Sequence, residues 1–134
     1  MDKTRTSKAR KAVLDEGQAL ERLVKRLLGC QGPLTPGKFT PILVKCARQT
    51  CRCHRGERHQ TYYLYVTRGV RLKRVYVPKA DQMRVQEQSE RYGEFRADRV
   101  KLRKVFDRLM AAVDDLEAGL TERYREHGAK GDRP

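Results

Sequence analysis

The sequence predicts an α+β fold, in which an N-terminal helix and a long C-terminal helix flank a small β element with a Cys/His metal loop. Apolar residues recur at helical spacing near both ends of the chain, and two runs of aromatic and β-branched residues lie between them. Three Cys and two His also lie in one stretch of 14 residues inside the middle segment. A chain of 134 residues has room for one small domain and too little for a large enzyme fold.

The N-terminal part is predicted to contain a basic flexible arm and an amphipathic helix. Residues 1–11 hold five basic side chains and one acid, and this arm could follow a phosphate backbone or serve solubility alone. A helix over residues 12–29 is predicted by apolar or small residues spaced three or four apart, which are Val13, Gly17, Leu20, Val24 and Leu27. Gly29 and the Gly- and Pro-rich residues 30–37 end this helix and mark a boundary.

The middle segment, residues 38–80, has the composition of strands. Residues 61–67 and 72–77 are rich in Tyr, Val and other strand-forming residues, and a turn containing Gly69 separates them. These two runs predict a β-hairpin. A third strand over residues 39–45 is expected, because an isolated two-stranded hairpin is only marginally stable.

One long helix is predicted over residues 81–126, which contain no Pro and many good helix formers, with Gly93 as a point where it could be interrupted. Its apolar residues repeat every seven positions in two series, which are Phe95, Leu102, Leu109 and Leu116, and Phe106, Val113 and Leu120. This coiled-coil-like seam, broken by Arg99, needs a partner. A helical hairpin with the first helix and a homodimer are both open, and residues 127–134 have the composition of a frayed tail.

The net charge of +14 is concentrated in the middle of the chain. Residues 38–80 hold eleven basic side chains and one acid, Glu57, whereas residues 81–134 hold twelve of each sign. A surface that serves only solubility usually mixes its signs along the whole chain. The expected partner is therefore a polyanion, and DNA or RNA is the commonest polyanion in a cell. A merely basic protein with a solvated charged face is the alternative.

The most specific local feature is the spacing C-x4-C-x-C-x5-H, formed by Cys46, Cys51, Cys53 and His59. Three thiolates and one imidazole are the ligands of a closed tetrahedral zinc site of the structural kind. His54 is an alternative ligand, and the single residue between Cys51 and Cys53 is a tight gap for two ligands of one ion. A redox or nucleophilic thiol, and ordinary thiols in a turn, stay open as alternatives. Cys30 lies outside this pattern and is interpreted as a free or buried thiol.

These motifs resemble those of a family of small bacterial proteins of unassigned function that are often encoded beside transposases and other mobile-element genes. Its members carry C-G-K-x-x-C-x-C-x-x-G-x-x-H-G-P-Y-Y, then a basic hairpin, Y-V-P-K and a long helix. Within residues 38–120 this sequence supplies the corresponding Cys46, Cys51, Cys53, Gly56, His59, Tyr62 and Tyr63, and the run Tyr76-Val77-Pro78-Lys79. It departs at Ala47, Arg48 and Gln60-Thr61, where the family has Gly, Lys and Gly-Pro. The resemblance implies a mobile-element context and no established reaction.

The basic hairpin and the metal loop form the predicted contact surface for nucleic acid. By strand alternation Tyr63, Tyr65 and Thr67 share one face, where basic neighbours could pair with phosphates while the rings stack on bases. Tyrosines in a hairpin are also ordinary cross-strand packing pairs. Arginines of the loop could bind phosphate groups bidentately. The predicted nucleic-acid-binding residues are Lys45, Arg48, Arg52, Arg55, Arg58, Tyr63, Tyr65, Arg68, Arg71, Lys73 and Arg74.

The sequence therefore favours a non-enzymatic, zinc-stabilised accessory module that binds DNA or RNA, and the resemblance adds a transposase or recombinase as partner. The middle segment lacks the carboxylate cluster that metal-dependent phosphoryl chemistry needs. The alternative is a protein-interaction adaptor that docks through its helices onto a larger protein or ribonucleoprotein assembly. No stretch is apolar enough for a membrane span, and the N-terminus is charged, so we expect a cytoplasmic bacterial protein without a membrane partner.

Overall fold

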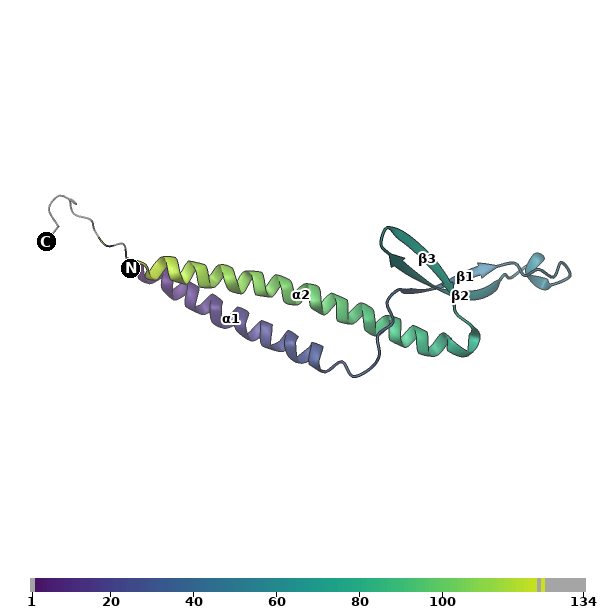
Figure 1. Ribbon diagram of the computed structural model, residues 1–134, viewed down its shortest axis with the longest axis horizontal. Helices are drawn as coiled ribbons and strands as arrows, with labels where there is room; N and C mark the ends of the chain where they lie inside the picture. The colour runs from purple at the N-terminus through teal and green to yellow at the C-terminus, as the bar shows by residue number, and fades with distance from the viewer. Residues whose placement is uncertain (1, 123, 125–134) are drawn as a thin grey trace. The chain divides into compact units, whose positions relative to one another are not determined.

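A computed structural model of the chain describes residues 2–122 and residue 124 (Figure 1), and it confirms the predicted α+β class. The elements in chain order are α1 (Lys3–Leu28), β1 (Lys38–Val44), the 3-10 helix η1 (Arg52–His54), β2 (His59–Arg68), β3 (Arg71–Tyr76), the 3-10 helix η2 (Lys79–Asp81) and α2 (Gln82–Leu120). They form two compact units. The sheet unit is Arg26–Arg99, and the helical unit consists of the described residues up to Lys25 together with those from Val100 onward.

Helix α1 begins at Lys3, close to the start of the chain. Asp2 caps it, because its Oδ1 accepts a hydrogen bond of 3.0 Å from the backbone N–H of Arg5. The guanidinium of Arg5 also forms an ion pair with Asp115 of α2, with 2.6 Å between Nη2 and Oδ1. The prediction of a flexible arm over residues 1–11 is therefore wrong from residue 3 onward. An acidic capping residue and a long-range ion pair order a segment whose composition alone resembles a disordered leader.

Small residues bring the two helices of the helical unit close together. There α1 and α2 run side by side and antiparallel (Figure 1). Thr6 and Ala9 of α1 are 5% and 2% exposed, and Gly119 of α2 is also buried. A Cβ atom added to Gly119 would lie 2.8 Å from Cγ2 of Thr6, which is closer than two carbon atoms can approach without a shift. The absence of a side chain at Gly119 thus sets the helix spacing at this end.

The predicted apolar series of α2 divides into two groups in the structure. The half-buried residues are Phe95, Leu102, Leu109 and Leu116, and the exposed ones are Phe106, Val113 and Leu120. A third series with the same spacing of seven is buried instead, and it consists of Val105, Ala112 and Gly119. The apolar pattern of the sequence did not reveal this series, because Ala112 and Gly119 are too small to stand out as seam residues. Small side chains are nevertheless what a closely spaced helix pair requires.

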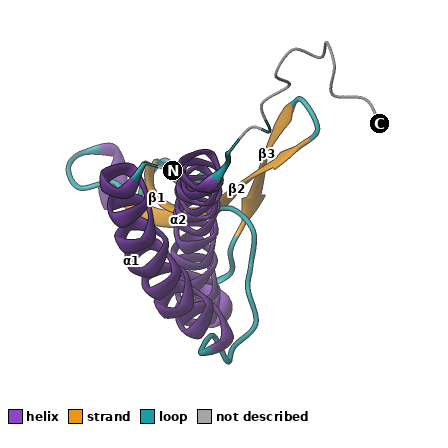
Figure 2. Ribbon diagram, turned by 90° about the vertical axis from the view of Figure 1, so that its left-hand side faces the viewer, coloured by secondary structure: helices purple, strands orange, loops and turns teal. Residues whose placement is uncertain are grey.

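The sheet unit holds three antiparallel strands in the order β1-β2-β3 (Figure 2), and β1 confirms the predicted third strand. In the β2–β3 hairpin, Arg68 pairs with Arg71, so the loop has two residues, Gly69 and Val70. Gly69 has φ of +64°, and no residue other than Gly has a positive φ in the described chain. A positive φ at the first loop position is typical of the tight turns that suit the twist of a hairpin. The Gly at this position is therefore the feature that closes the hairpin.

One face of the sheet packs against the N-terminal part of α2. The rings of Phe39 and Tyr62 stack with centroids 4.8 Å apart, and Leu64 in the central strand β2 is 8% exposed. Ser89 of α2 links helix to strand, since its Oγ donates to the carbonyl of Gly37 at 2.7 Å and accepts from the N–H of Phe39 at 3.3 Å. Gly37 has φ of +125° and leaves no room for a Cβ atom, so the chain can enter β1 there only with glycine.

Helix α2 is continuous through Gly93 and ends at Leu120, which is earlier than the predicted 81–126. Residues 121 and 122 have no helical structure, and the predicted tail at 127–134 lies outside the described residues. The family-like Y-V-P-K run leads into the helix through the 3-10 turn Lys79–Asp81. Within the described part of the chain, neither α-helix combines the length and the apolar character needed to cross a membrane.

Candidate metal centre and basic surface

The four residues of the C-x4-C-x-C-x5-H pattern converge at one end of the β1–β2 pair. Their ligand atoms all lie within 4.8 Å of one another. The sulfur atoms of Cys46 and Cys53 are 3.5 Å apart, and Sγ of Cys51 is 3.0 Å from Nε2 of His59. Zinc bonds of about 2.3 Å in a tetrahedral site would hold sulfur ligands about 3.8 Å apart. The cluster therefore has the size and the donor atoms to hold a metal ion.

The strands and two tight turns between them position these side chains. Cys46 follows β1 by two residues, and His59 opens β2 and pairs with the last residue of β1. The backbone N–H of Cys51 donates to the carbonyl of Arg48 at 3.1 Å, which closes the first turn. The 3-10 helix η1 forms the second turn and carries Cys53, which is 2% exposed and accepts from the N–H of Cys46 at 3.2 Å. The loop thus folds back so that its cysteines face the start of β2.

Local hydrogen bonds favour the metal-binding form of one cysteine. The backbone N–H of Cys53, and after it the ring of His59, lower the pKa of the Cys51 thiol to about 6. Desolvation by partial burial, followed by hydrogen bonds to the two other cysteines, raises the pKa of Cys46 above its ordinary value. A pKa of about 6 makes the Cys51 thiol largely a thiolate at neutral pH. The thiolate is the form of cysteine that binds metals.

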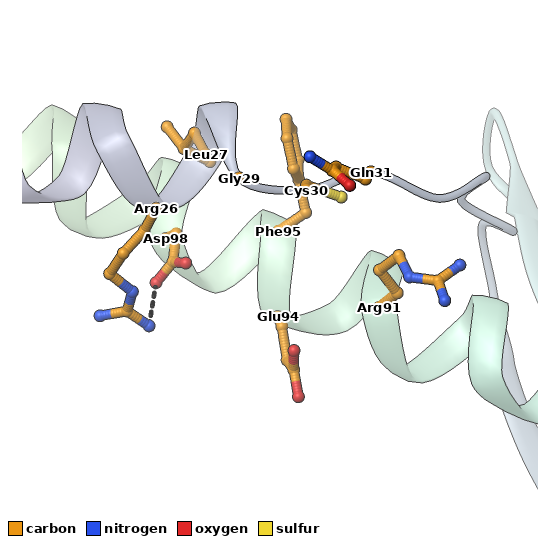
Figure 3. A pocket seen from close by; sticks show the side chains of 9 residues that line it. All are labelled: Arg26, Leu27, Gly29, Cys30, Gln31, Arg91, Glu94, Phe95 and Asp98. Carbon is orange, nitrogen blue, oxygen red and sulfur yellow. Dashed lines mark ion pairs between the residues drawn. The ribbon is translucent and has the colours of Figure 1, made fainter.

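Two residues that the sequence left open have other partners. His54, the alternative ligand, places its Nε2 2.9 Å from the carbonyl oxygen of Cys46 and so supports the loop from outside the cluster. Cys30 lies in the loop after α1, where it lines an open pocket of about 380 Å³ (Figure 3). The same pocket contains the ion pair between Arg26 and Asp98, with 2.9 Å between Nη2 and Oδ1. Cys30 is a half-buried free thiol, as the sequence indicated.

Arginines of the metal loop surround the cluster. One hollow of about 850 Å³ is lined by Cys51, Arg52, Cys53, Arg55, Gly56, Glu57, Arg58 and His59. Its three arginines are exposed, as are the nearby Lys45 and Arg48. Within the described residues none of these five side chains forms an ion pair with a carboxylate. Their charges are therefore available to an anion that approaches from solvent.

The face of the sheet opposite the α2 contact carries tyrosines between basic residues. The strand register aligns Lys38, Tyr65 and Arg74 in one row across the three strands, with Tyr63 and Tyr76 as neighbours in the next row. The guanidinium carbon of Arg74 lies 4.5 Å from the ring centroid of Tyr63, a cation–π contact. Tyr63 meets Tyr76 edge-on with centroids 5.7 Å apart. We call these five residues the tyrosine face.

The register also separates the predicted basic residues of the hairpin. Arg74 stands among the tyrosines, whereas Arg68, Arg71 and Lys73 align with the opposite face of the sheet. The residues predicted to bind nucleic acid did not include Lys38 or Tyr76. Alternation from Arg74 could have placed Tyr76 on the same face, but the position of Lys38 depends on the pairing of β1 with β2, which the sequence does not reveal.

Fold and site together define a small α+β protein with a Cys3His cluster between two strands. The chain belongs to the family DUF6788, described as a domain of unknown function, whose family model matches residues 13–87. That range contains the whole sheet and the cluster and stops shortly after α2 begins. No curated protein and no solved structure matches the chain.

Proposed function

We propose that this protein is a zinc-stabilised module that binds nucleic acid. A single observation carries the proposal: three potential metal ligands line the same hollow as three arginines that form no ion pair within the described residues. A metal held there would fix the backbone between these arginines. A rigid loop loses less conformational entropy on binding than a free loop does, so phosphate binding would gain directly from metal binding.

Zinc suits this role because the site is closed by its own side chains. Three sulfur atoms and one nitrogen atom are the full ligand set of a tetrahedral zinc ion, so no coordination position would remain for a reacting water molecule. Cys46, Cys51, Cys53 and His59 would hold the ion. The ion would supply folding free energy to a loop in which only Cys53 is fully buried. The proposed role of the metal is therefore structural.

The tyrosine face extends the same basic surface over the sheet. Tyr63 and Tyr65 are half-buried side chains with Lys38 and Arg74 beside them. Aromatic rings flanked by cations can stack on bases while the cations bind phosphates, which is how many proteins hold single-stranded nucleic acid. Residues 38–80 carry eleven basic side chains and one acid, so the electrostatic attraction extends over the whole segment.

We propose a binding role and not a catalytic one, because Glu57 is the one carboxylate in the basic segment. One carboxylate is too few to bind the two metal ions of a typical phosphoryl-transfer site. The resemblance to proteins encoded beside transposases supports the further proposal that the module assists a transposase or recombinase at its DNA. That partner is proposed from the resemblance alone and not from the site.

The test is a salt-titrated binding assay with the zinc-loaded full chain and fluorescent DNA and RNA, each single- and double-stranded. The triple variant Arg52→Ala, Arg55→Ala, Arg58→Ala removes the charges of the hollow. The control triple variant Arg96→Ala, Lys101→Ala, Lys104→Ala removes equal charge from exposed positions of α2. We expect the loop variant to lower the slope of log Kd against log salt by about 2 to 3, since each phosphate contact contributes about 0.9.

The control variant should leave this slope within about one unit of the original. Zinc content and circular dichroism of both variants show whether the loop is still folded. Absence of binding to any of the four nucleic acids at about 50 mM salt would overturn the proposal, because a charge-driven contact is strongest at low salt. Equal effects of the two triple variants would also contradict it, since they would assign binding to net charge alone.

A further inference from the structure

Helix α2 presents a second heptad pattern on its exposed surface in the helical unit. The residues are spaced three and four apart along the helix, and we call them the outer stripe: Arg103, Phe106, Met110, Val113, Glu117 and Leu120. The four apolar members are 46%, 43%, 39% and 41% exposed, in chain order. The spacing is that of the a and d positions of a coiled coil. A monomer thus leaves four apolar side chains at coiled-coil spacing exposed to solvent.

The interior of the helical unit is small compared with this exposed surface. Among the described residues of the unit, the apolar side chains that are buried are Ala9, Leu23, Val105 and Ala112. Two of these four are alanines, which contribute little apolar area. A pair of helices with so thin a core gains little free energy from packing. A further helical partner on the outer stripe would give α2 a second packed face, as in a four-helix bundle.

The charged ends of the outer stripe identify the partner. Arg103 begins the stripe and Glu117 stands near its end, so the stripe carries opposite charges at its two ends. We infer that a second copy of this chain packs on the outer stripe in an antiparallel orientation. In that orientation Met110 of each copy meets Val113 of the other, and Arg103 of each lies within about one helical turn of Glu117 of the other.

A parallel pair would be electrostatically unfavourable on the same stripe. It would place Arg103 of one copy beside Arg103 of the other, and Glu117 of one copy beside Glu117 of the other. Like charges in a seam repel. Within the described chain, Glu117 has no ion-pair partner, and Arg103 has a contact of 3.7 Å to Asp107 at an exposed position. Both charges are therefore available to an antiparallel neighbour. The inference does not rest on nucleic-acid binding, because the outer stripe lies in the helical unit.

The test measures the mass of the full chain by sedimentation equilibrium, as a function of concentration. The unchanged protein should be a dimer. The variants Arg103→Glu and Glu117→Arg should each raise the dimer Kd at least tenfold, because each creates two like-charge contacts. The double variant should restore the original Kd, and an equimolar mixture of the two single variants should form a mixed dimer. Circular dichroism reports whether each variant keeps its helices.

A matched pair of methionine variants tests the position of the contact. Met110→Glu puts a charge in the centre of the outer stripe and should give a monomer. Met83→Glu makes the same change at a position of α2 that is 77% exposed and lies in the sheet unit, and it should leave the dimer intact. A monomeric unchanged protein at about 100 µM would overturn the inference and assign the outer stripe to a different protein. Loss without rescue in the double variant would overturn the antiparallel orientation.

Discussion

His54 and His59 lie five positions apart in the chain and have different partners. Nε2 of His59 faces the sulfur of Cys51 at 3.0 Å, within the cluster. Nε2 of His54 faces the carbonyl oxygen of Cys46 at 2.9 Å, outside it. Spacing alone allowed either histidine to be the fourth ligand. The fold separates them because His54 belongs to a 3-10 turn, whereas His59 is the first residue of β2 and its ring lies beside the cysteines.

The two histidines make a matched test of the metal centre. His59→Ala removes a ligand atom and should lower zinc affinity at least tenfold, measured by competition with a chromophoric chelator. His54→Ala removes a hydrogen bond to the loop and should leave the stoichiometry at one zinc per chain. Equal losses in both variants would mean that the histidines act through the fold of the loop and not through coordination.

Helix α2 contains two glycines with opposite surroundings. Gly119 faces Thr6 of α1, where an added Cβ atom would be 2.8 Å from a side-chain carbon and 3.4 Å from a backbone nitrogen. Apart from its chain neighbours and the nearby backbone of its own helix, Gly93 has no atom within 4 Å of the position of a Cβ atom. Both residues lie inside the helix, where glycine costs about 0.5–1 kcal/mol relative to alanine. Gly119 is therefore explained by helix packing, whereas packing does not explain Gly93.

The same substitution at the two glycines should have opposite effects. Gly93→Ala should raise the free energy of unfolding by about 0.5–1 kcal/mol through helix propensity. Gly119→Ala should lower it by about 1–3 kcal/mol, because the methyl group forces α1 away from α2. Urea titrations followed by circular dichroism measure both values. A stabilising effect of Gly119→Ala would mean that the helices separate at this end without cost.

The sequence predicted elements well and their contacts poorly. Both helices, the hairpin, the third strand and the four clustered residues followed from spacing and composition. The start of α1 was not predicted, because the ion pair between Arg5 and Asp115 joins residues that lie far apart in the chain. The interior of the helix pair was not predicted either, since a pattern of large apolar residues cannot distinguish a seam of Ala and Gly from a solvent-exposed face.

Over the whole molecule, charge and packing are divided between the two units. The sheet unit contains the basic segment, the Cys3His cluster and the tyrosine face, whereas the helical unit contains the outer stripe. The basic residues of the sheet could be named from the sequence, but their faces depend on strand register. Lys38 joins Tyr65 and Arg74 only because β1 pairs with β2 in one particular alignment.

Removal of the metal should affect the two units differently. The cluster closes residues 45–58, which connect β1 to β2 and have only short turns of their own. Without an ion, the thiolates of this loop are no longer held together and its arginines lose their fixed positions. The ends of β1 and β2 that the loop joins also lose a constraint. The helix pair of the helical unit contains none of the cluster residues. Its packing should therefore survive metal removal.

Hydrogen–deuterium exchange of the full chain, read by mass spectrometry with and without a zinc chelator, measures this difference. We expect exchange to rise over residues 38–76 and to stay unchanged over residues 3–25 and 100–120. The Cys53→Ser variant without chelator should reproduce the pattern, because Cys53 is the most deeply buried ligand. A uniform rise along the chain would mean that both units unfold together, and unchanged exchange everywhere would show that the sheet folds without a metal.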